Sequence, residues 1–549
     1  MLLDHPYECY RDASPRWQDA NGLPAYRGKV VESWEYAPDF SYIDWTVKRG
    51  NHFHQGFGEV TAEDVLYTYN EGDPRFASEE TKALAESVGV GTVAHRGLPE
   101  PWMGKLELLD QFKFRMPLLN GRPEVNGLFQ FTDDSYPVGI YSKRAFEEMG
   151  WEWVRDNIVG SGPYEYEEMD SDVKWSMIAR NDPENEDEKI PFVYRWEILN
   201  IPDENVRLAM YKGGQAHRAW FDTPAIGIDL LNEGHSKTVP NGGKASVLFT
   251  FMGNYWESVE GQTGEPLERE ARGQIGNGGD EYPWICPPGP NPMMPEVSDC
   301  NNVAKKFRRA MFMGIDRRSL LTALYGGRGS LLLSPNANLG DPFILKHGDR
   351  WGDAYNPDAA KALFEEWKSE YTAMGGNSDK VKVSAWIGTS GRKEVTEAVL
   401  SHWESLFGIK WEMDNTPQAS WAPGAWRGRE GWQLVRDAAL TYRGNSMLWD
   451  VERWHTSLGQ PGSRNEGTEL LKATETILDK GEAWNDPAKQ EQLTLDWMDW
   501  FYDQHIATGV LEGQNVTDLY RSDYIETWTT RVPGVPWILW DPEYVTLRK

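Results

Sequence analysis

Residues 28–70 read GKVVESWEYAPDFSYIDWTVKRGNHFHQGFGEVTAEDVLYTYN, and this stretch decides how the rest of the chain is interpreted. Apolar and polar side chains alternate over residues 43–48, which is the period of a half-buried strand. Turn-forming residues precede and follow that strand. Thr61 with Asp64 three residues later has the pattern of a helix N-cap that leads into an apolar stripe. The stretch therefore predicts strand, turn, strand, turn and helix, packed as an α+β unit.

The length and the net charge of the chain limit the classes of protein that fit the sequence. A chain of 549 residues is too long for one hydrophobic core, so two or three domains are expected. No run of 18 apolar residues occurs, which excludes an apolar membrane-spanning segment. The formal net charge of −29 is unsuited to binding a phosphate backbone, so no nucleic acid partner is expected.

Three later segments also have strong local patterns. The text FRRAMFMGIDRRSLLTALYGG, within residues 302–327, predicts two helices, the second capped by Asp316. The text YNPDAAKAL predicts a helix with Asn356 as cap and Pro357 at its first position. Residues 381–413 read as strand, helix and strand, which predicts one β-α-β unit with parallel strands.

The motifs in this order resemble those of a known family. The Glu-Ser-Trp-Glu strand, the Arg-Gly-x-x-Phe-His turn and the Thr-Ala-Glu-Asp-Val helix start resemble the signature region of the family 5 extracytoplasmic solute-binding proteins of ABC importers. The FRRAMFMGIDRRSLL and YNPDAAKAL helices resemble two further motifs of that family, and the resemblance covers nearly the whole chain from residue 28 onward.

The resemblance implies a fold and its boundaries. The expected fold is α/β and two-lobed, of the type II periplasmic-binding-protein kind, with an extra small α+β subdomain in lobe 1. Lobe 1 is expected to comprise residues 1–253, with the subdomain at about 40–155. Lobe 2 is expected to span residues 254–511, and residues 512–549 to return to lobe 1.

The resemblance also implies a function. It predicts a monomeric receptor that is not an enzyme, captures an oligopeptide or oligosaccharide-like solute by closure of its lobes and delivers it to permease subunits in the membrane. No cofactor and no metal are expected. Its expected location is periplasmic or extracellular, associated with the membrane. Residues 1–10, MLLDHPYECY, lack the basic and apolar regions of a signal peptide, so we expect an upstream part to be missing.

Two other classes of protein stay open. No Gly-x-Ser-x-Gly, His-Glu-x-x-His or phosphate-loop motif occurs, yet a secreted carbohydrate-active enzyme with Trp platforms and a carboxylate pair is an alternative. A cytosolic binding protein without a transporter is the other. His52 and His54 are two imidazoles on one side of the expected strand, where packing at the strand end is favoured over a metal site.

The expected ligand contacts are mainly aromatic. Trp is the commonest aromatic residue here, with 27 copies, and its flat face stacks on sugar rings, peptide side chains and cations. Most of these Trp residues are expected in the core, whereas Trp421 and Trp426 lie in a loop-like stretch that the resemblance places at the cleft. The full expected set is Phe251, Asn254, Tyr255, Trp386, Trp421, Trp426, Asp437, Thr441, Tyr442 and Trp449.

One departure from the family pattern concerns the kind of ligand. Peptide-binding members commonly anchor the α-amino group with an Asp in a Trp-x-x-Asp-Tyr-like segment. Here Tyr442 matches the Tyr, Thr441 stands where the Asp would be, and Asp437 is four residues earlier. Because an uncompensated buried ammonium is costly, this departure favours a neutral ligand such as an oligosaccharide.

Overall fold

The computed structural model describes residues 3–4, 27–39, 41–73, 75–87, 103–118, 139–170, 173–180, 193–221, 223–237, 243–251, 253–254, 283–284, 299–331, 346–352, 354–386, 393–414, 434–437, 465–466, 487–505, 507–514, 518–528 and 545–548. The chain divides into two compact units. Unit 1 comprises Met1–Phe221, Leu230–Asn241 and Asp518–Lys549, and unit 2 comprises Asp222–Asp229 and Gly242–Thr517. The lobe boundaries at residues 253–254 and 511–512 stay predictions. None of the helices in the described ranges has the length and apolar character needed to cross a membrane.

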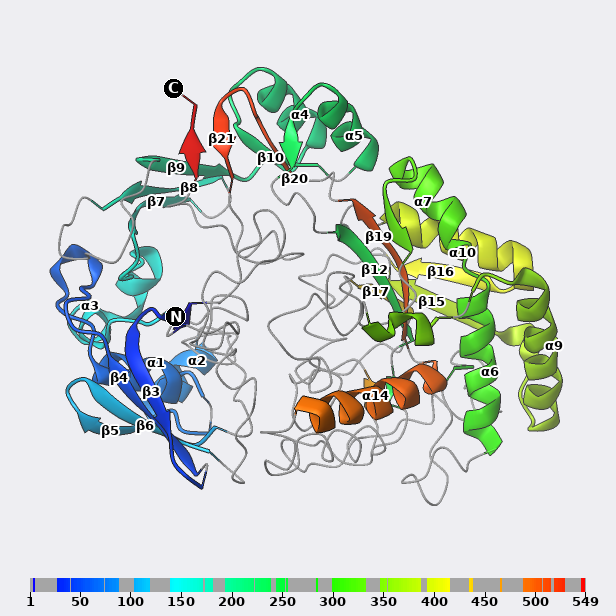
Figure 1. The fold of residues 1–549 in the computed structure, drawn as a ribbon, viewed down its shortest axis with the longest axis horizontal. Coiled ribbons are helices and arrows are strands. Elements are labelled where there is room, and N and C mark those ends of the chain that lie inside the picture. Colours follow the sequence, from blue (N-terminus) through cyan, green and yellow to red (C-terminus); the bar gives the residue numbers. More distant parts are fainter. Residues whose placement is uncertain are drawn as a thin grey trace. The chain divides into compact units, whose positions relative to one another are not determined.

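The predicted α+β unit is confirmed at the start of unit 1. Its antiparallel sheet has the order β3 (Val31–Tyr36), β4 (Tyr42–Val47), β6 (Lys113–Pro117) and β5 (Glu107–Asp110). Side chains of β4 alternate in burial, and the buried Trp45 stacks on Phe114 with 6.1 Å between ring centroids. The helices α1 (Ala62–Glu71) and α3 (Lys143–Asp156) share the core of this face, and α2 (Glu79–Ser87) follows α1 (Figure 1).

Asp64 joins the starts of two helices. Its Oδ2 accepts hydrogen bonds from Thr61 N at 2.9 Å and Thr61 Oγ1 at 2.8 Å, as the predicted N-cap requires. Its Oδ1 accepts from Lys143 N, at the start of α3, at 2.9 Å. One buried carboxylate therefore satisfies free backbone donors at the first turns of α1 and α3.

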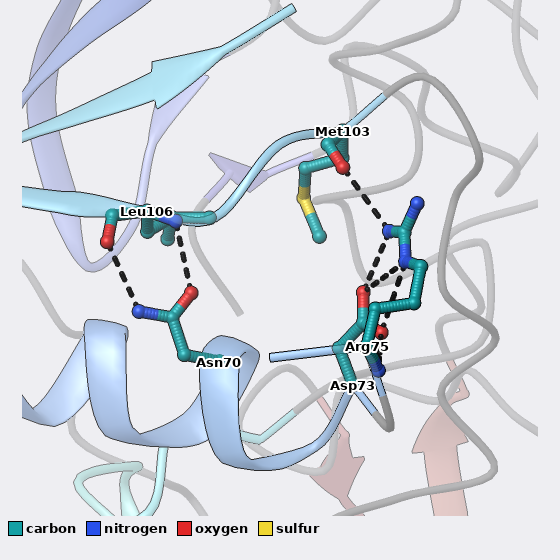
Figure 2. A network of polar contacts seen from close by, with 5 residues as sticks. All are labelled: Asn70, Asp73, Arg75, Met103 and Leu106. Atoms are coloured by element: carbon teal, nitrogen blue, oxygen red, sulfur yellow. Dashed lines mark hydrogen bonds and ion pairs between the residues drawn. The ribbon is translucent and has the colours of Figure 1, made fainter. Parts of the chain in front are cut away.

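The end of α1 is fixed to the strand region by side-chain amide and ion-pair contacts (Figure 2). Asn70 donates from Nδ2 to the Leu106 carbonyl at 3.0 Å and accepts at Oδ1 from Leu106 N at 2.9 Å. Beyond the helix, Arg75 pairs with the buried Asp73 at 2.6 Å and donates to the Met103 carbonyl at 3.1 Å. These contacts satisfy backbone groups at Met103 and Leu106, in the segment that leads into β5.

The remaining elements of unit 1 form small antiparallel sheets. One contains β7 (Tyr164–Asp170), β8 (Lys174–Ala179) and β9 (Arg195–Leu199), and another has the order β10 (Arg218–Trp220), β20 (Asp518–Tyr520) and β11 (Ser236–Lys237). The pairs β1 (Leu3–Asp4) with β2 (Arg27–Gly28) and β21 (Ile525–Thr527) with β22 (Thr546–Leu547) complete the set. The helix α4 (Glu204–Lys212) begins after its cap residue Asp203, and α5 (Pro224–Asn232) follows β10, with residues 224–229 belonging to unit 2. Residues 518–520 thus return the chain to unit 1.

Unit 2 is built on a mixed six-stranded sheet. Its order is β14 (Gly329–Leu331), β19 (Ala507–Gln514), β12 (Gly243–Phe251), β17 (Leu434–Asp437), β15 (Lys382–Trp386) and β16 (Lys410–Asp414). β15 runs parallel to both β16 and β17, and the other neighbours are antiparallel. The helix α10 (Lys393–Phe407) connects β15 to β16, which confirms the predicted β-α-β unit.

Unit 2 contains four further helices. They are α6 (Asp299–Met313), α7 (Arg317–Tyr325), α9 (Pro357–Ala373) and α14 (Pro487–Gln504). The predicted caps Asp316 and Asn356 accept hydrogen bonds from Ser319 N and Ala359 N. Figure 1 shows α6, α9 and α10 beside the sheet, where Phe249 packs on Trp403 of α10. β12 ends at Phe251, and the short strand β13 (Gly253–Asn254) pairs with β18 (Asn465–Glu466).

Candidate functional site

Two of the expected ligand residues end neighbouring parallel strands of unit 2. Trp386 is the last residue of β15 and Asp437 is the last residue of β17. Because the two strands are parallel, their carboxyl ends point to the same edge of the sheet. Ligands of open α/β sheets bind outside the carboxyl ends of the strands. The topology therefore brings an indole-bearing and a carboxylate-bearing residue to the edge where a ligand site is expected.

The register adds a third residue, Asp414, to this edge. Trp386 pairs with Asp414 of β16 on one side and with Val435 of β17 on the other. Paired residues of neighbouring strands share a face, and Val435 and Asp437 share one because they are two apart. Trp386, Asp414 and Asp437 therefore lie on one face of the sheet. We call these three residues the carboxyl-edge cluster.

The opposite face of the same strands belongs to the core. Phe249 and Phe251 of β12 lie on that face, because they alternate with Thr250, which pairs with Val435. Phe249 contacts Trp403 of α10, with ring centroids 5.9 Å apart. Phe251 contacts Phe307 of α6, also with ring centroids 5.9 Å apart. The carboxyl-edge cluster thus lies on the face away from α6 and α10.

Phe251, one of the expected ligand residues, is a core residue in this structure. Its side chain is fully buried, and its ring stacks on Phe312 with centroids 5.4 Å apart and tilts against Trp284 at 5.2 Å. These aromatic partners occupy its surroundings, so we leave Phe251 out of the proposed ligand set. Asn254 lies on β13, which belongs to a separate two-stranded sheet, and pairs with Glu466 of β18. The other expected residues lie outside the described ranges: Tyr255, Trp421, Trp426, Thr441, Tyr442 and Trp449.

The edge that carries the cluster is also the edge where the chain enters and leaves the sheet. β12 starts at Gly243 opposite Gln514, the last residue of β19, and runs antiparallel to β17. Arg317 holds β19 in place by donating to the Gly509 carbonyl and to Thr508 Oγ1, both at 3.0 Å. Arg317 is buried, and its charge-assisted hydrogen bonds to oxygen acceptors hold β19, the strand by which the chain leaves the sheet, within unit 2.

His54, one of the two histidines weighed above as a metal site, is held by hydrogen bonds to a neighbouring turn. His54 lies in the short 3-10 helix η1 (His54–Gly56) rather than in a strand, and Gln55 takes a left-handed conformation with φ 58°. Gly160 N donates to His54 Nδ1 at 3.3 Å, so His54 carries its proton on Nε2 and donates to the Gly162 carbonyl at 2.9 Å. Both ring nitrogens of His54 are thus used to hold the Gly160–Gly162 turn. No group of three or more metal-ligating side chains occurs within the described ranges.

Asp414 is the residue of the carboxyl-edge cluster that sequence reasoning missed. The strand-helix-strand pattern predicted over residues 381–413 ends one residue short of the observed end of β16. A usable signal was present, because the β-α-β pattern already predicted parallel strands whose last residues share an edge. The carboxylate directly after the strand pattern was therefore a candidate on the same grounds as Trp386.

Comparison with known structures shows the fold. The chain is similar to the periplasmic binding protein DppA of Helicobacter pylori in complex with the peptide STSA, with 14% identity, a TM-score of 0.65 and coverage of 100% of this chain and 92% of that one. It is also similar to NikA of Brucella suis in complex with Fe(III)-EDTA, at 11% identity, TM-score 0.65 and coverage of 100% and 94%. A third is the mannohexaose-bound oligopeptide-binding protein of Thermotoga maritima, at 14% identity, TM-score 0.64 and coverage of 96% and 87%. Comparison with curated protein sequences gave no match.

The architecture and these likenesses define the class as the two-lobed α/β periplasmic binding proteins, which confirms the expected fold class. The family model "Bacterial extracellular solute-binding proteins, family 5 Middle" matches residues 25–437. The chain therefore belongs to the family 5 extracellular solute-binding proteins. Members of this family bind small solutes for ABC importers, interact with ABC permeases and are not enzymes, which removes the carbohydrate-active enzyme as an alternative.

Proposed function

We propose that this protein is a monomeric, cofactor-free receptor that captures an oligopeptide or oligosaccharide-like solute outside the cytoplasm and delivers it to the permease of an ABC importer. The observation that carries the proposal is the position of Trp386 and Asp437 at the carboxyl ends of β15 and β17. A Trp face supplies apolar contact and stacking, and a carboxylate accepts hydrogen bonds from hydroxyl or ammonium groups. Both ligand classes offer such groups.

Capture proceeds by closure of the two lobes over the solute. Closure is driven only by the better contacts that the solute makes with the closed state. We assign those contacts to Trp386 and Asp437, to Trp421 and Trp426, and to residues 441–449. In that segment Thr441 and Tyr442 are the hydrogen-bonding groups and Trp449 is a further stacking surface, and Asn254 and Tyr255 contribute from the segment after β12.

The ligands of the similar structures span the same two classes. The Helicobacter protein was solved with a peptide and the Thermotoga protein with mannohexaose. At 14% identity these likenesses show the fold alone, so each ligand class must be tested on this chain directly.

A thermal-shift screen of the purified chain against di- to pentapeptides and oligosaccharides tests the proposal. A ligand that binds only the native state raises the free energy of unfolding by mass action, by about 2.7 kcal/mol at a ligand concentration of 100 times its Kd, and it thereby raises the melting temperature. We expect a saturable rise with one of the two classes. A screen in which neither class shifts the melting temperature would contradict the proposal.

A further inference from the structure

The helix α14 is followed by a histidine in a backbone conformation that usually selects glycine. His505 comes directly after Gln504, the last residue of α14, and has φ 50°, in the left-handed region. Many helices end at such a residue, and glycine is favoured there because it has no Cβ. In the same unit, left-handed glycines follow α7 at Gly326 and α10 at Gly408. A histidine at this position indicates a role for its side chain that glycine could not fill.

The imidazole of His505 lies at the corner where α14 turns into β19. It is buried, and it meets the ring of Tyr502 in a T-shaped arrangement with 5.3 Å between ring centroids. The backbone N–H of His505 donates to the Tyr502 carbonyl at 3.0 Å. Beyond the corner, Thr508 Oγ1 accepts a hydrogen bond from the buried Arg317 at 3.0 Å. The ring is therefore enclosed between two anchored backbone segments.

The helix α6 brings positive charge to this corner. Lys305, Arg308 and Arg309, all on α6, lie close enough to disfavour a positive charge on His505. The carboxylate next to the corner, Asp503, pairs with Lys305 at 2.8 Å. A proton on the buried ring would thus add a positive charge beside others of the same sign, where water does not reach it.

Arg308 already serves as the cation that the end of α14 favours. A positive charge is usually stabilised beside the carbonyl groups at the C-terminal end of a helix. Arg308 is fully buried and donates from Nε to the Gln504 carbonyl at 3.0 Å and from Nη1 to the Trp284 carbonyl at 2.6 Å. Burial, followed by the charges on α6, holds the pKa of His505 well below its ordinary value of 6.5.

We infer that His505 is an acid-sensitive latch at the junction of α14 and β19, which holds this corner closed while the ring is neutral and opens it on protonation. Opening gives the charged ring access to water and separates it from the cations of α6. The latch acts on β19, the strand after which the chain passes from unit 2 to residues 518–549 of unit 1.

The sign of the pH dependence follows from the two states of the corner. The open form takes up a proton at about pH 6.5, whereas the closed form does so only at a more acidic pH. The contribution of His505 to the free energy of opening is therefore complete above pH 6.5. It is lost as the pH falls below 6.5 towards the lowered pKa of the closed form.

Hydrogen exchange of the full chain, followed by mass spectrometry, measures opening of the corner between pH 7.5 and 5. Peptides that cover residues 499–511 should lose protection below pH 6.5. After correction for the intrinsic exchange rate, the loss should reach up to about tenfold per pH unit, since opening takes up one proton. Peptides from α10 report on unfolding of unit 2 as a whole and should keep their protection.

His505→Asn removes the titrating ring and suits the backbone, because asparagine also tolerates the left-handed conformation. Protection of residues 499–511 in this variant should not change with pH over the same range. His402→Asn is the matched control, since His402 is a half-buried histidine of α10 in the same unit, and it should behave as the native chain does. Circular dichroism at pH 7.5 shows whether each variant is folded.

Arg309→Gln tests the latch without altering the buried ring. Arg309 is exposed on α6, and after burial its charge contributes most to the lowered pKa of His505. Its removal should reduce the loss of protection at pH 5, because the protonated ring then meets one like charge fewer. Arg318→Gln, at an exposed position on α7, removes a positive charge elsewhere in unit 2 and should leave the loss unchanged.

Each outcome bears on the latch itself. Protection that does not change with pH in the native chain, or the same loss in His505→Asn as in the native chain, would overturn it. An equal loss in the α10 peptides would mean acid unfolding of the whole of unit 2 and would also overturn it. If His505→Asn does not fold, Arg309→Gln decides, and an unchanged loss in that variant contradicts the inference. No solute enters these measurements, so they leave the proposed function untouched.

Discussion

Arg218 and Asp518 form a two-point ion pair across 300 residues of sequence, with Nε–Oδ1 at 2.9 Å and Nη2–Oδ2 at 2.6 Å. Arg218 begins β10, and Asp518 begins β20, the strand that the returning chain inserts between β10 and β11. The Asp518 side chain is 1% exposed and that of Arg218 is 26% exposed. The pair therefore fastens the C-terminal part of unit 1 to its middle part.

Asp518→Asn should destabilise unit 1 by roughly 2 kcal/mol, because it removes the charge from a buried partner of Arg218 while keeping its size. Chemical denaturation of the two proteins, followed by circular dichroism, measures the difference. Asp156→Asn is the matched control, since Asp156 pairs with Arg155 on the exposed surface of the same unit. Equal denaturation midpoints for Asp518→Asn and the native chain would show that the pair is not a fastening point.

Asn70→Asp should destabilise unit 1 by roughly 2 kcal/mol or more. The substitution keeps the shape of the side chain but replaces the Nδ2 donor with an oxygen that faces the Leu106 carbonyl. Thermal unfolding at pH 7 checks the loss. Asn205→Asp, at an exposed first-turn position of α4, adds the same charge to the same unit and should cost nothing, because a negative charge is favourable near a helix N-terminus. A similar loss from both substitutions would refute the role of the amide.

His54 predicts a dependence of stability on pH. Burial holds the pKa of His54 below its ordinary value of 6.5, and the positive charge of Arg180 acts in the same direction. Above pH 6.5 the side chain is neutral in the folded and unfolded states, whereas below pH 6.5 the unfolded state takes up the proton first. The contribution of His54 is therefore complete above pH 6.5 and is lost as the pH falls towards the lowered pKa of the folded state.

Denaturation curves at pH 7, 6 and 5 should show a steeper loss of stability for the native chain than for His54→Gln, which cannot titrate. His217, His235 and His505 also have lowered pKa values through burial, so the difference between the two slopes isolates His54. Parallel slopes for the two proteins would mean that His54 is protonated as easily in the folded state as in the unfolded one.

Gly314→Ala should destabilise unit 2 by about 1–3 kcal/mol through overpacking. Gly314 lies between α6 and α7, and an added Cβ would sit 3.0 Å from Phe407 Cζ and 3.1 Å from Leu406 Cδ2 of α10. Gly139→Ala is the control, because an added Cβ at Gly139 meets no atom within 4 Å. A native melting temperature for Gly314→Ala would show that α10 moves freely away from α6.

Local elements were predictable from the sequence where local chemistry decides them. Asp316 and Asn356 cap their helices with their own side chains, so their patterns needed no knowledge of the rest of the fold. The insertion of β20 between β10 and β11 had no such pattern, because its partners are about 300 residues away. The helix α3 continues to Asp156 through Gly150 at φ 79°, a bend that an apolar period does not reveal.

The ligand-binding roles of the expected residues stay predictions, and the structure shows where Trp386, Asp437 and Phe251 lie on the strands. Trp386 and Asp437 were expected as ligand residues and lie together at a sheet edge. Phe251 was expected in the ligand set, but side-chain alternation puts it on the core face with Phe307 and Phe312. Which face a strand residue occupies depends on the register with its neighbours, and that register is not visible in a single strand.

The most direct test of the central claim is titration calorimetry of the full chain with the best ligand of the screen, followed by mass spectrometry of the recovered ligand. The account predicts saturable binding of one ligand per chain and recovery of the ligand unchanged. Consumption of the ligand during the titration, or the absence of saturable binding, would contradict a receptor that captures its solute without chemistry.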